Sequence, residues 1–245
     1  MKRLQRKLGW LKELPDYRDI SYKGVIKKLP TSVDLTDKQS PIKDQGTLGS
    51  CTANALAGVL EYNEPKDSPL IELSRLFIYY IEREYEGTVN SDAGAMIRDG
   101  IKMLAKFGVC PEEIWPYFIE KFNIKPSKKC YKEALKRKIT SYATMDTLSQ
   151  MKQCLAEGRP FAFGFTVYES FMNGDVSKTG IMTIPEEGEG VMGGHAVIGV
   201  GYDDVKQVIK VRNSWGKSWG DKGYFYMPYY YSEKTLSDDY WTIIS

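Results

Sequence analysis

The sequence is poor in the residues that usually bind metals. Its 245 residues include one histidine, His195, and four cysteines, Cys51, Cys110, Cys130 and Cys154. No two cysteines form a C-x-x-C pair, which argues against a zinc knuckle and against a thioredoxin-type redox motif. Metal ligands are therefore scarce, and we expect neither a metal nor an organic cofactor. In a reducing compartment we expect Cys110 and Cys130 to stay unpaired.

The sequence also lacks a long hydrophobic run and a strong charge bias. No segment approaches the roughly 18 apolar residues of a membrane span, so no membrane partner is expected. The formal net charge of +2 is too small to indicate a polyanionic partner. The basic run 125–138 has few interleaved aromatics, which favours a solvated surface and no nucleic-acid binding. Residues 1–10 lack an export-signal core, so a cytoplasmic location is the default, with another export route left open.

The order of the elements predicts an α+β protein with two lobes. The chain is long enough for one large domain or two lobes. Apolar residues at helical spacing and capping signals predict helices beginning near Ser50, over 74–84, from Ile97 to a stop at Gly108, and after Thr147. Segments rich in β-branched and aromatic residues predict strands over 161–167, 195–200, 208–212, 224–227 and 240–244. We therefore expect a mainly helical lobe over 29–140 and a mainly β lobe over 141–245, after an extension over 1–28.

Cys51 lies at the predicted start of an Ala-rich helix, after Gly49 and Ser50. Unpaired N–H groups and the positive end of a helix dipole favour a thiolate over a thiol there. Cys51 is thus a candidate nucleophile near neutral pH. A small buried cysteine that starts a core helix is an equally good interpretation of this segment alone.

The single imidazole has a candidate partner eighteen residues further along the chain. The alternation around His195 and the strand 208–212 fit a hairpin, which would return Asn213 to the side of His195. An imidazole that moves protons at one nitrogen needs the other held by a hydrogen bond, and an amide provides this without adding a charge. Trp215 would shield that bond from water, or would pack in the core, and the two roles are compatible.

Three blocks of the chain together resemble the papain-like cysteine peptidases, family C1, of a non-secreted microbial type. The blocks are Asp44-Gln45-Gly46…Gly49-Ser50-Cys51, Gly194-His195-Ala196-Val197…Gly199…Gly201-Tyr202 and Asn213-Ser214-Trp215-Gly216…Trp219-Gly220…Gly223-Tyr224. They occur in the family's order and bracket most of residues 30–227. The resemblance implies a papain-like two-lobed fold, with the active-site cleft between a helical N-terminal lobe and a barrel-like C-terminal lobe.

The resemblance also implies a role for each matching residue. Cys51 would be the nucleophile, His195 the general base and acid, and Asn213 the residue that orients His195. Gln45 would donate to the oxyanion together with the Cys51 N–H. The implied substrate-binding residues are Gly94, Met96, Ala196 and Trp215. The implied reaction is hydrolysis of peptide or protein substrates through an acyl-enzyme thioester.

Other functions of the same residues stay open. A peptide ligase or transpeptidase would use the same thioester, and a catalytically silent protein would keep the cleft only to bind peptides. Two positions depart from the family pattern: Leu48 replaces a cysteine of secreted members, and Thr52 replaces the tryptophan that commonly follows the nucleophile. Residues 1–28 are shorter than the usual inhibitory propeptide. They are either a reduced prosegment lying over the cleft or a permanent part of the fold.

Overall fold

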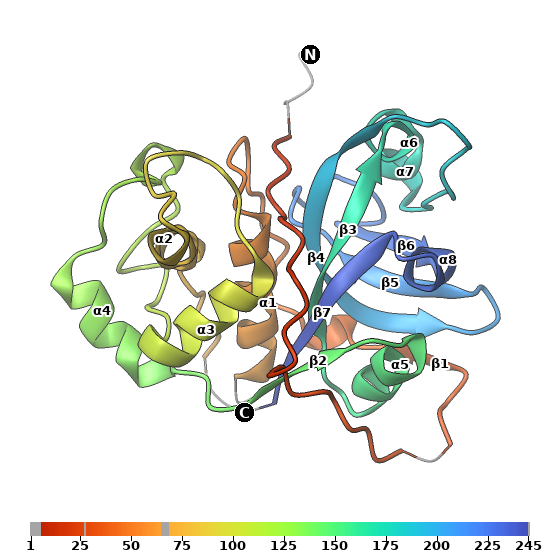
Figure 1. Cartoon of the computed structure of the whole chain (residues 1–245), viewed down its shortest axis with the longest axis horizontal. Helices are drawn as coiled ribbons and strands as arrows, with labels where there is room; N and C mark the ends of the chain where they lie inside the picture. Colours follow the sequence, from red (N-terminus) through yellow and green to blue (C-terminus); the bar gives the residue numbers. More distant parts are fainter. Residues whose placement is uncertain (1–5, 27, 65–68, 245) are drawn as a thin grey trace.

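The computed structural model describes residues 6–26, 28–64 and 69–244, and it has the expected α+β class. Helices gather on one side and a twisted sheet on the other, with α1 between them (Figure 1). One apolar cluster lies mainly among the helices, and a second lies within the sheet lobe. The expectations for residues 1–5 and 27 within the N-terminal extension lie outside the described residues.

The helical lobe is built as the capping signals predict. The Ser74 side chain accepts a hydrogen bond from the Phe77 N–H at the start of the second helix, and Gly108, with a φ of 73°, follows the third. The helices of this lobe are α1 (Cys51–Asn63), α2 (Arg75–Glu86), α3 (Ile97–Phe107) and α4 (Lys128–Ala134). Short 3-10 turns η1 (Thr36–Lys38), η2 (Ile119–Lys121) and η3 (Leu135–Arg137) complete the described helical segments of the first half.

The second lobe is a mostly sequential antiparallel sheet. Its strands are β1 (Ser32–Asp34), β2 (Tyr142–Met145), β3 (Phe161–Tyr168), β4 (Val191–Asp203), β5 (Val208–Arg212), β6 (Tyr224–Pro228) and β7 (Ser237–Ile243). Within the described ranges the order is β2-β7-β3-β4-β5-β6, and β1 pairs with β4. The sheet therefore takes one short strand, β1, from the part of the chain that was expected to be mainly helical.

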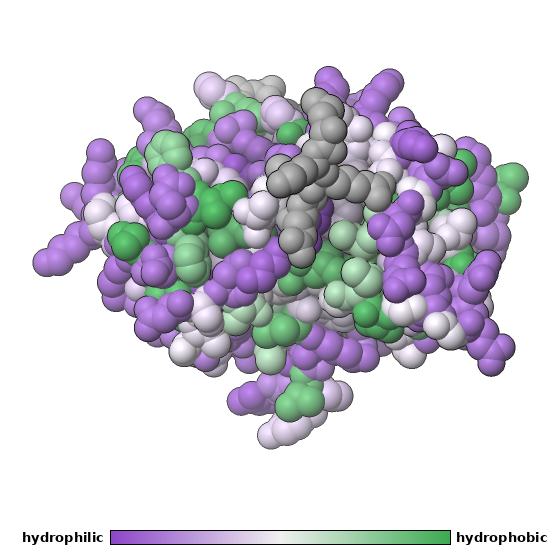
Figure 2. Space-filling model, turned by 90° about the horizontal axis from the view of Figure 1, so that it is seen from above, coloured by the Kyte–Doolittle hydropathy of each residue, from purple (hydrophilic) through white to green (hydrophobic). Residues whose placement is uncertain are grey.

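Short helices surround the sheet. They are α5 (Leu148–Ala156), α6 (Glu169–Asn173), α7 (Val176–Thr179) and α8 (Tyr230–Glu233). The capping box expected at Thr147 is present, because its side chain and that of Gln150 bond each other's backbone N–H groups. No helix in the described ranges is long and apolar enough to cross a membrane. Figure 2 shows hydrophilic residues interspersed with small apolar patches on the upper face.

The N-terminal segment lies in the groove between the two lobes. We call residues 6–22 the strap; its chain runs down the centre of the molecule in Figure 1, between α1 and α3 on one side and the sheet on the other. The Trp10 N–H donates to the Gly194 oxygen of β4 at 3.0 Å. On the helical side, the Leu11 N–H donates to the Ala95 oxygen at 3.1 Å, and the Ala95 N–H donates to the Gly9 oxygen at 2.9 Å. The strap is thus hydrogen-bonded to both lobes.

Glycine is required where the strap passes closest to the body. A Cβ on Gly9 would lie 1.9 Å from the backbone oxygen of Gly49, and a Cβ on Gly94 would lie 2.2 Å from the Gly9 oxygen. In both cases the added Cβ would meet backbone atoms, so no side-chain rotation relieves the overlap. Ion pairs fix the same stretch: Arg6 with Asp44, and Lys7 with Asp92 at 2.8 Å.

We predict that Gly9→Ala displaces the strap, because its new methyl group would overlap the Gly49 carbonyl. The expected result is at least about tenfold faster hydrogen exchange at the Trp10 and Leu11 amides. Leu14→Ala is the matched control, since the Leu14 side chain in the same strap is 79% exposed. Unchanged exchange in Gly9→Ala would contradict the tight seating of the strap.

Candidate active site

Cys51 is the first residue of α1, as the sequence predicts, but its thiol is completely buried. The backbone N–H groups of Gly9 in the strap and of Ala196 in β4 both donate to it. Burial nevertheless raises the pKa of Cys51 to about 11, and these donors oppose that rise only in part. The expected thiolate is therefore absent while the strap covers the site, because desolvation outweighs the helix N-terminus.

His195 is held by Asn213 as predicted. Its Nε2 lies 2.8 Å from the Asn213 Oδ1, which also accepts the Ser214 N–H at 2.8 Å. Because the Ser214 N–H requires an oxygen there, the amide orientation is fixed, and Nε2 must carry the proton. Nδ1 is left as the unprotonated nitrogen, and it has no hydrogen-bond partner among the described residues. Burial lowers the pKa of His195 to about 4, so the ring is neutral.

The strands that carry these residues form the predicted hairpin. β4 and β5 pair antiparallel, with Ile198 opposite Arg212, so Asn213 returns beside His195. The Trp215 ring stacks on the imidazole with centroids 4.7 Å apart and planes at 28°, which shields the His195–Asn213 bond as expected. The N–H of Ala196, the residue after His195, donates to the Cys51 thiol. The helix with the thiol and the strand with the imidazole are thus in direct contact.

Gln45 is fixed beside this pair by residues that the motif did not single out. The Gln45 N–H donates to the Ser214 oxygen at 2.9 Å, and the Ser214 hydroxyl donates to the Gln45 Oε1 at 2.7 Å. These bonds leave Nε2 as the donor, and it donates to the Leu48 oxygen at 2.9 Å and the Lys7 oxygen at 3.1 Å. The Lys7 carbonyl of the strap therefore accepts a hydrogen bond from the Gln45 amide, which the resemblance assigns to the oxyanion.

The loop before Cys51 has a further support. The Asp92 carboxylate accepts the Gly49 N–H at 3.0 Å and the Tyr79 hydroxyl. Asp92 also pairs with Lys7 of the strap. Sequence reasoning missed Asp92 and Ser214, although Ser214 lies next to Asn213 in a block that was already identified.

The expected substrate-binding residues have different surroundings. Gly94 lies against the strap, but its neighbour Ala95 makes both backbone hydrogen bonds to it. Met96 precedes α3, and its N–H donates to the Glu86 carboxylate at 2.8 Å. Ala196 and Trp215 are buried beside Cys51 and His195 respectively. Binding of substrate by these four residues stays a prediction.

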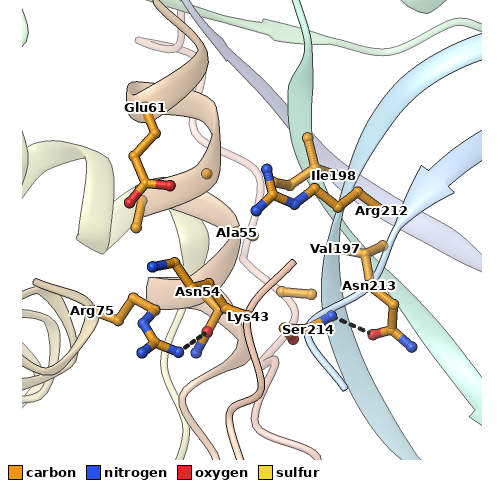
Figure 3. Close-up of a pocket in the computed structure, with 13 residues that line it drawn as sticks. Lys43, Asn54, Ala55, Glu61, Arg75, Val197, Ile198, Arg212, Asn213 and Ser214 are labelled. Carbon is orange, nitrogen blue, oxygen red and sulfur yellow. Dashed lines mark hydrogen bonds between the residues drawn. The ribbon is translucent and has the colours of Figure 1, made fainter. Parts of the chain in front are cut away.

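Buried charged side chains, among them Arg212 and Glu61, line a small pocket beside Asn213 (Figure 3). The Arg212 guanidinium donates to the Ser40 hydroxyl at 3.1 Å, and that hydroxyl donates to the Glu61 carboxylate of α1. Arg212 and Glu61 line a cavity of about 10 Å³, the space of about one water. The cavity is too small for a substrate, and the network joins α1 to the strand that ends next to Asn213.

The four cysteines are free thiols, Cys51 among them. Cys110 and Cys130 contact each other in the interior of the helical lobe, and burial raises the pKa of Cys110 to about 12. No cluster of three or more His, Cys, Asp or Glu side chains within residues 6–26, 28–64 and 69–244 is arranged to hold a metal ion. The reactive groups gathered at this site are the thiol, the imidazole and the amide donors.

Comparison with known proteins identifies the family of this chain. A curated relative, an uncharacterized peptidase C1-like protein of Acanthamoeba polyphaga mimivirus, is 40% identical over 98% of this chain and 87% of its own length. Chymopapain of Carica papaya is 29% identical over 85% of this chain and 57% of its own length. The crystal structure of xylellain, a cysteine protease from Xylella fastidiosa, is 44% identical, with a TM-score of 0.91, over 100% of this chain and 98% of that one. Residues 29–239 match the profile described as papain family cysteine protease, and the chain belongs to this family.

Proposed function

We propose that this cysteine peptidase uses Cys51, His195, Asn213 and Gln45 in the roles that their geometry supports. His195 Nδ1 removes the thiol proton, and the sulfur attacks the substrate carbonyl carbon. The Gln45 Nε2 and the Cys51 N–H donate to the resulting oxyanion. His195 then protonates the leaving amine, which leaves a thioester on Cys51. Water, deprotonated by His195, attacks the thioester, and the acid product leaves as the thiol forms again.

The observation that carries this proposal is the state of the imidazole. Asn213 holds Nε2 as the protonated nitrogen, which keeps the unpartnered Nδ1 as a base next to the strand contact with Cys51. A ligase, a transpeptidase and a silent peptide-binding protein are the alternatives, and no observation favours them. An intact nucleophile, base and amide donor set favours hydrolysis over silent binding.

We further propose that the N-terminal segment 1–28 inhibits the enzyme intramolecularly. The supporting observations lie in the described strap: it contributes the Gly9 N–H to the Cys51 thiol and the Lys7 carbonyl to the Gln45 amide. The strap thus takes up hydrogen-bonding positions at both the thiol and the amide donor. Removal or displacement of the strap is then required before a substrate reaches Cys51.

A pair of buried acidic groups joins the strap to the body below the active site. Glu13 of the strap and Asp239 of β7 are both largely buried, and Arg98 of α3 contacts Glu13 at 3.2 Å. Burial and the nearby Asp239 charge raise the pKa of Glu13 to about 8. Arg98 also pairs with Asp19, so its single positive charge is shared between the carboxylates of Glu13 and Asp19. Docking of the strap therefore favours a protonated Glu13.

We also propose a reducing compartment, such as the cytoplasm, as the place of action. The four free thiols support this location, because oxidising compartments favour disulfides.

We predict that Cys51→Ala abolishes peptide hydrolysis, because the nucleophile is lost. Gln45→Ala should lower kcat by roughly 100- to 1,000-fold, as expected for one oxyanion donor. Cys154→Ala is the matched control, since Cys154 is a buried thiol in α5, and it should retain activity. The measurement is steady-state hydrolysis of a peptide mixture. Substantial turnover in Cys51→Ala would rule out the proposed mechanism.

We predict that inhibition by the strap weakens as pH rises. Docking raises the pKa of Glu13 from its ordinary value of 4.5 to about 8, so docking takes up a proton. The equilibrium constant for docking is therefore largest below pH 4.5. It falls by up to about tenfold per pH unit until about pH 8. The side chain in Glu13→Gln stays neutral, so docking of its strap should not weaken as pH rises. This variant should therefore be less active than the wild type at pH 8.

The measurement is the ratio of wild-type to Glu13→Gln activity between pH 5.5 and 8.5. This ratio cancels the titration of the Cys51–His195 pair, which both proteins share. We expect the ratio to rise with pH. A flat ratio would show that Glu13 does not control the seating of the strap.

A further inference from the structure

A buried carboxyl group contacts the first turn of α1 from the side of α2. Glu82 of α2 and Thr52, the second residue of α1, are both completely buried. The Thr52 hydroxyl donates to the Glu82 Oε2 at 2.9 Å, whereas the Glu82 Oε1 has no hydrogen-bond partner in the part of the chain that the structure describes. Burial of a carboxyl group is costly, and the mechanism proposed above does not use it.

The helices α1, α2 and α3 lie together in the helical lobe (Figure 1), and Glu82 lies where they meet. A Cβ on Gly100 of α3 would lie 2.4 Å from the Glu82 Oε1 and 2.5 Å from the Leu56 Cδ1 of α1. Gly100 therefore leaves the space that the carboxyl group and the Leu56 side chain fill. The carboxyl group is packed between α1 and α3, with its Oε2 directed at Thr52.

The surroundings of Glu82 fit a neutral carboxylic acid better than a carboxylate. A carboxylate can accept several hydrogen bonds, but Glu82 receives one within the described ranges, from Thr52. The guanidinium of the next residue, Arg83, donates instead to the backbone oxygens of Tyr79, Val89, Ser91 and Phe122. Burial, together with the acidic groups Glu86 of α2 and Asp99 of α3, raises the pKa of Glu82 well above its usual value. The Thr52 hydroxyl and the Arg83 charge oppose this rise only in part.

Thr52 also contacts the proposed nucleophile. Its backbone N–H donates to the Cys51 thiol, and its side chain is tied to α2 through Glu82. The direction of that N–H therefore depends on the side-chain bond, because both groups belong to one residue of the first turn. Beyond the effect of burial, a negative charge on Glu82 raises the pKa of Cys51 and so disfavours the thiolate. A neutral acid holds the start of α1 without opposing the thiolate.

We propose that Glu82, as a neutral carboxylic acid, is a positioning residue of the peptidase, which holds Thr52 and thereby orients the Cys51 sulfur for attack. The inference rests on the proposed role of Cys51 as the nucleophile. Glu82 is buried behind the start of α1, so its loss changes the rate of the chemical step and not the binding of substrate. A hydrogen bond has a preferred direction, which apolar packing in the same place does not supply.

The first experiment compares steady-state peptide hydrolysis by full-length variants, all of which carry the strap. Thr52→Val keeps the shape of the side chain but removes the hydroxyl, and it should lower kcat by roughly tenfold and leave KM within about twofold. Thr52→Ser keeps the hydroxyl and should retain most of the activity. Glu82→Gln keeps a neutral group that accepts the Thr52 hydroxyl, so its kcat should stay within about threefold of the wild type.

Glu84→Gln is the matched control. Glu84 lies on the same helix in a partly exposed ion pair with Lys125, so this variant should hydrolyse peptides at the wild-type rate. Wild-type kcat in Thr52→Val would show that the bond to Glu82 does not orient the sulfur, and it would overturn the proposal. A Glu82→Gln enzyme as slow as Thr52→Val would show that the carboxyl group acts as an anion, which would overturn it equally.

The double variant Thr52→Val, Glu82→Met separates positioning from stability. Thr52→Val alone leaves the carboxyl group without its partner and should lower Tm, whereas apolar replacement of both partners is nearly neutral for stability. We expect the double variant to recover the wild-type Tm to within about 2 °C but to keep the lowered kcat. Recovery of kcat together with Tm would show a merely structural role and would contradict the proposal.

Two measurements on the full chain need no turnover. The infrared difference spectrum of the wild type minus Glu82→Gln at pH 7 should contain the C=O band of a protonated carboxylic acid, and that of the wild type minus Glu84→Gln should not. Hydrogen exchange of the amide of residue 52 should be roughly tenfold faster in Thr52→Val and in the double variant than in Glu82→Gln. A carboxylate band in place of the acid band, or equal exchange in all variants, would overturn the proposal.

These measurements also separate the inference from the proposed function. If neither the wild type nor any variant cleaves peptides, the proposed role of Cys51 fails. The infrared band and the exchange of the residue 52 amide then still decide whether a neutral Glu82 holds Thr52 at the start of α1.

Discussion

The packing of α1 against β4 is the contact on which the active site depends. It brings the thiol of Cys51, at the first residue of α1, against the backbone of Ala196 in β4, next to the imidazole. The buried path from Arg212 through Ser40 to Glu61 reinforces the same contact from behind. Hydrogen bonds to Ser214 hold both Asn213 and Gln45. One segment therefore positions the amide of Gln45 and, through Asn213, the imidazole. A thiol from one lobe and an imidazole from the other thus form a single site.

Burial decides the protonation state of this site. A helix N-terminus favours a thiolate, but the Cys51 thiol and the His195 ring have no exposed surface beneath the strap. Separating charge between two groups without water is costly, so the pKa of the thiol rises and the pKa of the imidazole falls. The covered enzyme contains a neutral pair. Under the proposed function, the strap would block access to the sulfur while burial keeps the thiol protonated.

The strap fits the groove between the lobes closely. It uses Gly9 where the backbones approach most closely and Trp10 where the sheet provides a pocket, and its basic residues pair with Asp44 and Asp92. Its Trp10 indole and its Glu13 N–H both donate to the Asp239 carboxylate of the sheet. The strap thus satisfies buried polar groups of the groove that would otherwise lack a partner.

The sequence by itself predicted the α+β class, the helix ends at Ser74, Gly108 and Thr147, the β4–β5 hairpin and the pairing of His195 with Asn213, because these depend on local spacing and capping. Three features were decided only by the tertiary structure. β1 joins the sheet because it lies beside β4, Asp239 faces Trp10 across 229 residues of chain, and burial raises the pKa of the Cys51 thiol. Each depends on contacts between distant segments and on exclusion of water, which no local pattern in the sequence encodes.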